Sequence, residues 1–311
     1  SILNALNNQH KRIIACVVDT ECCYKNTNTH GLVFHFGAVF GDITQEHTFE
    51  TYNMDYYVEE VITNIENAYF KKKGMFKQYN EVSEEWELVE GWIYNINPMF
   101  QEAQKDAFKN PHKVKKWKEI MREFNRELIT RNVDYITSYN YNFDIGSNRK
   151  VGTIRLTQNQ LSDKGFYMPR GIEHFDLMEI SAICLANRTF RTWLNSLDQE
   201  DKEKMLTAKG NKSYSAQTML RYLSKDLYYI EQHTALRDAL CEFRLLMELW
   251  KGNKSIIKKH FVNNVQGVSR SDFENGVSVK QSLINRTKRA KGKKAKSVKS
   301  KQLTLNLKGG K

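Results

Sequence analysis

One apolar run near the start of the sequence, Ile13 to Val18, most constrains the fold, because it is followed at once by Asp19 and Glu21. A strand that covers only one face of a sheet alternates apolar and polar residues, whereas a strand that is apolar at every position is buried on both faces. Residues 12–18 therefore predict a central strand with packed layers on both sides. Because alternate strand residues point the same way, Asp19 and Glu21 are expected to project from one face.

Apolar spacing along the rest of the sequence predicts the other elements. Strands are predicted over 31–41, 46–50 and 133–137, and the short links between the first three strands indicate an antiparallel meander. Helical spacing dominates 55–131 and returns over 176–250. This order predicts an α/β domain in which helices flank a mixed central sheet.

Positive charge is concentrated in one stretch. The formal net charge is +12, and residues 285–311 hold eleven Lys and Arg and no Asp or Glu, which leaves about +1 for the remaining residues. Such a stretch favours a nucleic-acid partner, with a solubilising role as the alternative. Without aromatic residues or an apolar stripe, it is expected to be disordered.

The sequence divides accordingly into one domain and several short segments. The domain is expected over 1–265, with a helical insertion at about 55–130. A connector over 266–284, a basic linker over 285–301 and a short apolar motif over 302–307 are expected after it. No apolar stretch approaches the ~20 residues that span a bilayer. The five cysteines lack CxxC spacing, so a cytoplasmic protein is expected.

A helix predicted over 236–250 places one acid where charge is costly. Asp238 is aligned with one of the two apolar stripes of this helix, so its carboxylate points toward packed protein. An isolated buried charge is unfavourable, so Asp238 requires either a metal ion or an Arg or Lys partner. His233 fits the loop before the helix, with Thr234 as the N-cap, and from there it could face the same site.

Three short motifs resemble those of the DEDDh 3′→5′ exonucleases, which include the proofreading epsilon subunit of bacterial polymerase III and RNase T. The motifs are Val18-Asp19-Thr20-Glu21, Asn140-x-x-Phe143-Asp144 and His233-Thr-Ala-Leu-Arg-Asp238-Ala239, in family order. The resemblance implies an RNase H-like fold and release of 5′-nucleoside monophosphates. It also implies two Mg²⁺ or Mn²⁺ ions held by Asp19, Glu21, Asp144 and Asp238, and His233 as the base that activates water.

Contacts to the nucleic-acid strand are expected from aromatic and basic residues around these motifs, because stacking and phosphate contacts hold a strand without sequence preference. The candidates are Tyr24, Tyr139, Asn140, Tyr141, Phe143, Arg149, Arg188 and Arg191, with Lys150, Arg155 and Arg170 in the same stretch. DNA is the favoured substrate and RNA the alternative. A non-catalytic adaptor with a nuclease fold is the hypothesis from another functional class.

The segment Gln302-Leu303-Thr304-Leu305-Asn306-Leu307 resembles the peptide that binds bacterial sliding clamps. Gln302, Leu303, Leu305 and Leu307 carry the resemblance, and they follow the basic linker. Tethering through such a peptide would raise the concentration of the nuclease at a DNA end. A bacterial cell or a phage-infected bacterium is therefore the expected setting, in DNA replication or repair.

Overall fold

A six-stranded mixed sheet forms the centre of the structure, a computed structural model that describes residues 12–23, 31–45, 50–146, 151–162, 167–185, 188–211 and 213–260. The strand order is β6-β3-β2-β1-β7-β8. Strand β2 runs antiparallel to both β1 and β3, whereas the other neighbouring pairs are parallel. The strands are β1 (Ile14–Cys22), β2 (Val33–Asp42), β3 (Thr51–Val58), β6 (Val114–Lys115), β7 (Tyr135–Ser138) and β8 (Glu173–Asp176).

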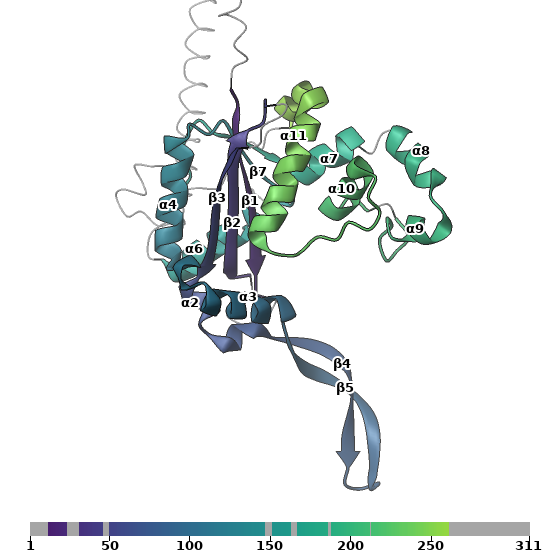
Figure 1. The fold of residues 1–311 in the computed structure, drawn as a ribbon. Helices are drawn as coiled ribbons and strands as arrows, with labels where there is room; N and C mark the ends of the chain where they lie inside the picture. Colours follow the sequence, from purple (N-terminus) through teal and green to yellow (C-terminus); the bar gives the residue numbers. More distant parts are fainter. Residues whose placement is uncertain are drawn as a thin grey trace, which may run out of the picture.

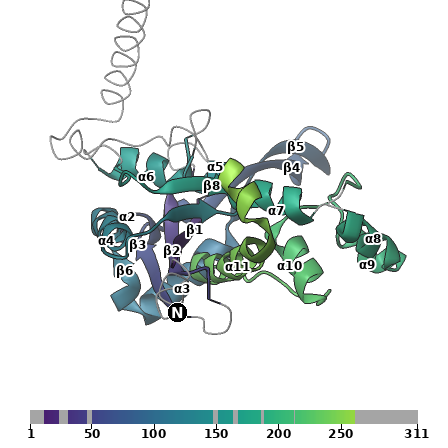
Figure 2. The same ribbon diagram turned by 90° about the horizontal axis from the view of Figure 1, so that it is seen from above.

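Apolar layers cover both faces of this sheet, as the run in β1 predicts. Cys16 and Val18 pack into one layer, and Ala15 and Val17 pack into the other. Figures 1 and 2 show α4 and α6 on one side of the sheet and α7, α10 and α11 on the other. These helices are α4 (Trp117–Thr130), α6 (Thr153–Leu161), α7 (Leu177–Leu185), α10 (Ala216–Ser224) and α11 (Ala235–Lys259).

The predicted fold class is confirmed. The antiparallel meander at the start, the central position of β1 and the strand near 133–137 are all present. Helices also dominate 176–250, where the shorter elements are α8 (Arg188–Ser196) and α9 (Gln199–Glu203). The mixed central sheet flanked by helices is the α/β arrangement that the sequence predicts. None of the described helices combines the length and the apolarity needed to cross a bilayer.

The prediction of a helical insertion over 55–130 is only partly correct. That region does contain α2 (Glu59–Ile62), α3 (Pro98–Lys109) and α4, but a long antiparallel hairpin replaces helix in its middle. The hairpin consists of β4 (Tyr69–Asn80) and β5 (Glu85–Ile96), and it projects away from the body of the molecule (Figure 1). Short 3₁₀ segments, η1 (Ile65–Ala68) and η2 (Pro111–Lys113), flank the hairpin and α3.

Some predictions lie outside the described residues. The third strand begins at Thr51, and residues 46–49 of its predicted position are among those not described. The connector, the basic linker and the 302–307 motif also lie outside the described part.

Candidate functional site

The site begins at the end of β1. Asp19 and Glu21 are two residues apart on this strand, so they project to the side of the sheet that α11 covers. Asp19 is paired with Gly37 of β2 and Glu21 with His35. A register shift follows between Glu21 and Cys22, where the regular strand ends. Both carboxylates are thus held by the most central strand of the sheet.

Gly37 allows the first turn of α11 to approach these carboxylates. A Cβ atom at Gly37 would lie 2.4 Å from the backbone carbon of Ala235, closer than real Cβ atoms approach. Only glycine lets α11 begin directly on β2, and Asp238 lies in the first turn of that helix. The glycine opposite Asp19 therefore positions Asp238 beside β1.

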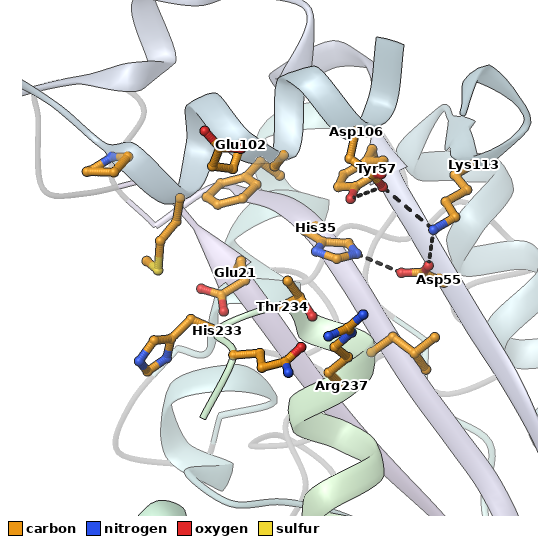
Figure 3. A pocket seen from close by; sticks show the side chains of 16 residues that line it. Glu21, His35, Asp55, Tyr57, Glu102, Asp106, Lys113, His233, Thr234 and Arg237 are labelled. Atoms are coloured by element: carbon orange, nitrogen blue, oxygen red, sulfur yellow. Dashed lines mark hydrogen bonds and ion pairs between the residues drawn. The ribbon is translucent and has the colours of Figure 1, made fainter. Parts of the chain in front are cut away.

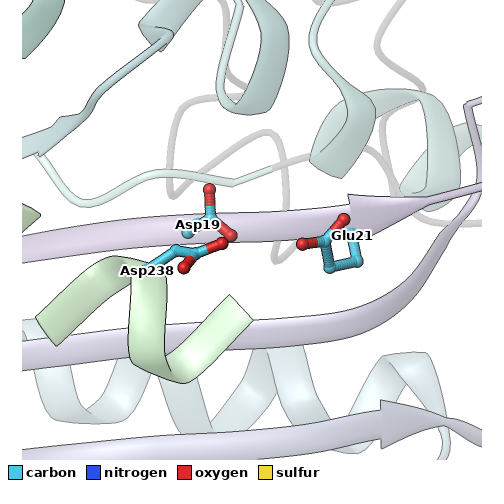
Figure 4. A group of neighbouring side chains, drawn as sticks. All are labelled: Asp19, Glu21 and Asp238. Carbon is cyan, nitrogen blue, oxygen red and sulfur yellow. The ribbon is translucent and has the colours of Figure 1, made fainter. Parts of the chain in front are cut away.

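Three carboxylates meet at this point. One oxygen from each of Asp19, Glu21 and Asp238 lies within 4.8 Å of the others. Figure 4 shows the three side chains side by side. Asp238 is 5% exposed, and its Oδ1 has no hydrogen-bond partner among the described residues. The prediction that Asp238 points toward packed protein is confirmed.

Asp144 lies next to this group and is oriented differently. It closes the short helix α5 (Tyr141–Asp144) after β7 and is 2% exposed. The hydroxyl of Thr20 donates to its Oδ1 at 2.5 Å, and Thr20 points to the opposite face of β1 from Asp19. Asp144 is nevertheless close enough for its charge to raise the pKa values of Asp19 and Glu21, so it is a neighbour of the carboxylate group.

His233 lies in the loop before α11, as predicted. Its backbone is left-handed, with a φ of 50°, and its side chain is exposed. Thr234 occupies the N-cap position, although its side chain accepts no capping hydrogen bond. Burial raises the pKa of Asp238, and a hydrogen bond from the backbone of His233 acts in the opposite direction, which ties the loop to the carboxylate group. The exposed imidazole of His233 is therefore accessible to solvent and substrate next to the carboxylate group.

A cavity of about 620 Å³ opens beside Glu21 and His233. Figure 3 shows the far side of the cavity lined by an ionic network. His35 Nε2 lies 2.7 Å from Asp55 Oδ1, and Lys113 Nζ lies 2.7 Å from Asp55 Oδ2. The remaining lining mixes apolar side chains, among them Phe34, Met99 and Leu236, with polar ones such as Glu102 and Arg237. The cavity thus offers both apolar surface and fixed charges next to the carboxylates.

Burial and mutual repulsion raise the pKa of each carboxyl group in the site. The pKa of Asp19 is well above its ordinary value because of burial and then the charge of Asp144. Burial and then Asp238 raise the pKa of Glu21 to about 8. Burial and then Glu231 raise the pKa of Asp238 to about 7. Acids packed together in this way ionise readily only beside positive charge.

Two further acids belong to these surroundings and were not identified from the sequence. Glu242 lies one helical turn after Asp238, is 3% exposed, and accepts the backbone N–H of Tyr139 at 3.1 Å through Oε2. Glu231 precedes His233 in the loop, and burial raises its pKa. The four-residue spacing from Asp238 was a usable signal for Glu242, because such residues share a helix face.

A divalent metal ion fits the carboxylate group of Asp19, Glu21 and Asp238. Carboxylate oxygens are the ligands that Mg²⁺ and Mn²⁺ prefer. The unpartnered Oδ1 of Asp238 is the strongest indication, because a buried carboxylate oxygen normally has a partner. The neighbouring charges that most affect the pKa values of these three carboxyl groups are those of other acids, so a bound cation would relieve their repulsion.

Two predicted substrate contacts are core residues instead. Tyr139 is 7% exposed, and its hydroxyl donates to the carbonyl of Tyr214. Tyr141 is fully buried, and its hydroxyl lies 2.9 Å from His174 Nδ1. Their rings pack in the layers on either side of the sheet and cannot stack on a bound strand.

The other predicted contacts have varied surroundings. Asn140, Arg170 and Arg191 are exposed, Phe143 is half-buried and Arg155 is buried. Tyr24, Arg149 and Lys150, together with the side chain of Arg188, lie outside the described part of the chain.

Comparison with protein-family models and with curated protein sequences finds no match. Among solved structures, the nuclease domain of 3′hExo, a DEDDh family member bound to rAMP, aligns with a TM-score of 0.43 at 11% identity, covering 78% of this chain and 94% of the other. A full-length 3′-exonuclease aligns at 0.42 and 11% identity, over 77% and 82% of the two chains. A 3′-exonuclease that recognises the 3′ end of a histone mRNA stem-loop aligns at 0.42 and 10% identity, with the same coverage. Similarity at this level assigns no function, so the function of this chain is inferred from its own side chains.

Proposed function

We propose that this protein is a metal-dependent 3′→5′ exonuclease that releases 5′-nucleoside monophosphates. One observation carries the proposal: carboxylate oxygens of Asp19, Glu21 and Asp238 lie within 4.8 Å of one another, from elements far apart in the sequence. The three DEDDh-like motifs supply these residues in family order, and the 3′→5′ direction is taken from that resemblance. A cavity beside the carboxylates provides room for a terminal nucleotide.

Asp19, Glu21, Asp144 and Asp238 would hold two Mg²⁺ or Mn²⁺ ions. Two such ions, when bound, stabilise the attacking and leaving oxygens of an in-line phosphoryl displacement. The carboxylates themselves are held in place before binding, because β1 fixes Asp19 and Glu21 and the first turn of α11 fixes Asp238. Thr20 fixes Asp144 through its hydrogen bond of 2.5 Å.

His233 is proposed as the general base. An imidazole suits proton transfer near neutral pH, and the exposed side chain of His233 lines the same cavity as Glu21. It would accept a proton from the attacking water. The nearby carboxylate of Glu231 would stabilise the resulting imidazolium: burial raises the pKa of Glu231, and the charge of His233 acts to lower it.

The test is hydrolysis by the purified full chain with Mg²⁺ on single- and double-stranded DNA and RNA, labelled at either end. We expect mononucleotides released from the 3′ end, activity lost in EDTA, and activity lost in Asp19→Asn. Asp42→Asn is the matched control, because Asp42 is a buried carboxylate at the other end of the same sheet, where it pairs with Arg12. Normal turnover by Asp19→Asn would refute the proposal, and the preferred nucleic acid decides between DNA and RNA.

We also propose that the 302–307 motif recruits the nuclease to a bacterial-type sliding clamp, which favours DNA as the substrate. The proposal depends on the sequence Gln302-Leu303-Thr304-Leu305-Asn306-Leu307 and the basic residues before it. Deleting 302–307 should weaken clamp binding and leave the hydrolysis of short oligonucleotides unchanged. Undiminished clamp affinity after the deletion would contradict clamp recruitment.

A further inference from the structure

The β4–β5 hairpin is a projecting arm with a large exposed apolar surface. Its strands pair continuously from Tyr69 opposite Ile96 to Asn80 opposite Glu85. Figure 1 shows that most of the arm extends beyond the layers that cover the central sheet. Exposed apolar patches of this kind on a protein surface commonly mark binding sites.

Most of the exposed apolar side chains of the two strands lie on one face of the arm, and Phe76, 38% exposed, lies on the other. Because residues alternate between faces along each strand, the register places this set together. We call it the aromatic face, and its residues are 39–66% exposed: Tyr69, Met75, Tyr79, Trp86, Leu88, Trp92, Tyr94 and Ile96. On the other face, Phe76 packs over Gly91 and Ile93 packs over Gly74. The glycine face therefore has a smaller exposed apolar surface than the aromatic face, which carries four exposed rings, Tyr79, Trp86, Trp92 and Tyr94, besides Tyr69.

Lysines are interspersed among the rings of the aromatic face. Lys73 is paired with Trp92, and its Nζ lies 5.9 Å from the centre of the Trp92 ring. Lys77 is paired with Leu88. Glu90, opposite Met75, is an acid on the same face. The face thus combines flat π surfaces with ammonium groups.

The base of the arm adjoins the candidate active site. Strand β5 ends at Ile96, and Asn97 then caps α3 by accepting the backbone N–H of Met99. Pro98 and Met99 line the cavity that also contains Glu21 and His233. A chain bound along the arm would therefore lead toward the cavity.

We propose that the aromatic face binds single-stranded nucleic acid and guides it to the active site. Bases stack on exposed aromatic rings whatever their sequence, and lysines contact the phosphates. A protein partner would also use Trp, Tyr and Met, but lysine is depleted in protein–protein interfaces. The lysines among the rings therefore favour a strand of nucleic acid. The guiding role rests on the proposed nuclease function, whereas strand binding can be measured without cleavage.

The experiment measures binding of the full chain to a fluorescent single-stranded oligonucleotide by anisotropy in EDTA, over a range of salt concentrations. The basic residues over 285–311 also attract nucleic acid, but that contribution falls with salt. Affinities are therefore compared at the highest salt that still allows binding, where stacking dominates. DNA and RNA oligonucleotides of equal length are measured in parallel.

Replacing both rings in Trp86→Leu/Trp92→Leu keeps apolar surface but removes stacking. We expect affinity to fall about 5- to 150-fold per ring, the range found for base stacking. Trp86→Phe/Trp92→Phe should retain most of the binding. Gln78→Ala, an exposed position on the opposite face, is the matched control and should bind as the wild type does.

A second variant tests the charges independently of the rings. In Lys73→Gln/Lys77→Gln, the slope of log affinity against log salt should become shallower by about 0.7 for each phosphate that the lysines no longer neutralise. A purely structural role of the two lysines would not change this slope. Unchanged Mn²⁺ binding in both double variants would show that the site next to the arm is intact.

Unchanged strand affinity in Trp86→Leu/Trp92→Leu would overturn the inference. A second outcome would also overturn it. If light scattering shows that the wild type is a dimer and that this variant is a monomer with the same strand affinity, the face binds a second copy of the chain. Loss of strand binding in a protein that cleaves no nucleic acid would support the arm and refute the nuclease proposal. If the ring substitutions change neither cleavage nor strand binding, the result would support the nuclease proposal and refute the role of the arm.

Discussion

The carboxylate site and the β4–β5 arm differ in the kind of group that lacks a partner: acidic groups in the site and apolar side chains in the arm. The site buries charges, and the Oδ1 of Asp238 has no partner among the described residues. The arm exposes large rings, with Trp86 at 66% and Trp92 at 60%. A buried negative charge is stabilised by a cation, and a large exposed apolar surface is stabilised by contact with a binding partner. We therefore propose that each region is completed by a ligand: a divalent ion in one and a nucleic-acid strand in the other.

The two regions also differ in what holds them. Asp19 and Asp238 are fixed by the most central strand and by a helix that packs directly on Gly37. The arm is held mainly by the pairing of its own two strands. Changes in the arm should therefore leave the site intact, whereas changes around Gly37 should alter the site itself.

The largest expected effect is the loss of hydrolysis in Asp19→Ala. Metal-assisted catalysis supplies several kcal/mol of transition-state stabilisation, so the rate should fall on the order of 10⁴-fold or more. The thermal stability of the metal-free variant should be equal or higher, because a half-buried carboxylate that neighbouring acids repel is removed. Single-turnover rates and calorimetry measure both. If the variant is inactive because it is unfolded, the result would not support a catalytic role for Asp19.

His233→Ala should lower the rate about 10²- to 10⁴-fold, the usual contribution of a positioned acid or base. The side chain of His233 is exposed, and the group that could hold a metal ion consists of Asp19, Glu21 and Asp238, so the Mn²⁺ affinity of the variant should stay unchanged. Calorimetric titration alongside the rate distinguishes the two roles. Equal loss of rate and of metal affinity would make His233 a structural residue of the site.

Replacing residues 71–94 with a short Gly-Ser turn should separate the arm from the site. Metal binding and hydrolysis of a dinucleotide should persist, since the dinucleotide is too short to need the arm. Affinity for a long single strand should fall about 10- to 10³-fold, since several bases would no longer stack on the protein. Loss of dinucleotide hydrolysis would instead show that the arm is part of the catalytic structure.

Gly37→Ala should destabilise the fold by about 1–3 kcal/mol, the usual cost of overpacking. The new methyl group would lie 2.4 Å from the Ala235 backbone and push α11 outward. Asp238 would move with the helix, so Mn²⁺ affinity should also fall. Gly171→Ala is not a suitable control because Gly171 has a φ of 86°, whereas Gly252→Ala meets open space and serves well.

The smallest expected effect is a pH-dependent loss of stability in the metal-free protein. The folded pKa of Glu21 is about 8 and that of Asp238 about 7, while both are about 4 in an unfolded chain. Between those values the unfolded chain binds fewer protons, so the free energy of unfolding falls as pH rises from about 4 to 8 and then levels off. We expect a progressive loss over this pH range, measured by denaturant titration in EDTA. A metal-free protein that gains stability over this range would contradict the raised pKa values.

The sequence predicts the site better than it predicts the arm, for physical reasons. The apolar run before Asp19 predicts a doubly buried strand, and the position of Asp238 on its helix predicts a buried charge; both are confirmed. For Glu242 the sequence offers only its helix face, shared with Asp238. Its hydrogen bond from the backbone N–H of Tyr139, a residue distant in the sequence, is visible only in the structure.

The hairpin was missed because its turn lacks the usual signal. Glu84 adopts a left-handed φ of 56°, where hairpin turns normally have Gly or Asn. In addition, three consecutive lysines over 71–73 interrupt the alternation expected of a strand. The pairing of β4 with β5 is set by cross-strand contacts that a local pattern does not report.

The most direct test of the account is the location of Mn²⁺ by anomalous diffraction in crystals of the full chain. We predict an anomalous peak within coordination distance of carboxylate oxygens of Asp19, Glu21 and Asp238, and its loss in Asp238→Asn. A crystal at saturating Mn²⁺ with no peak among these three carboxylates would contradict the account.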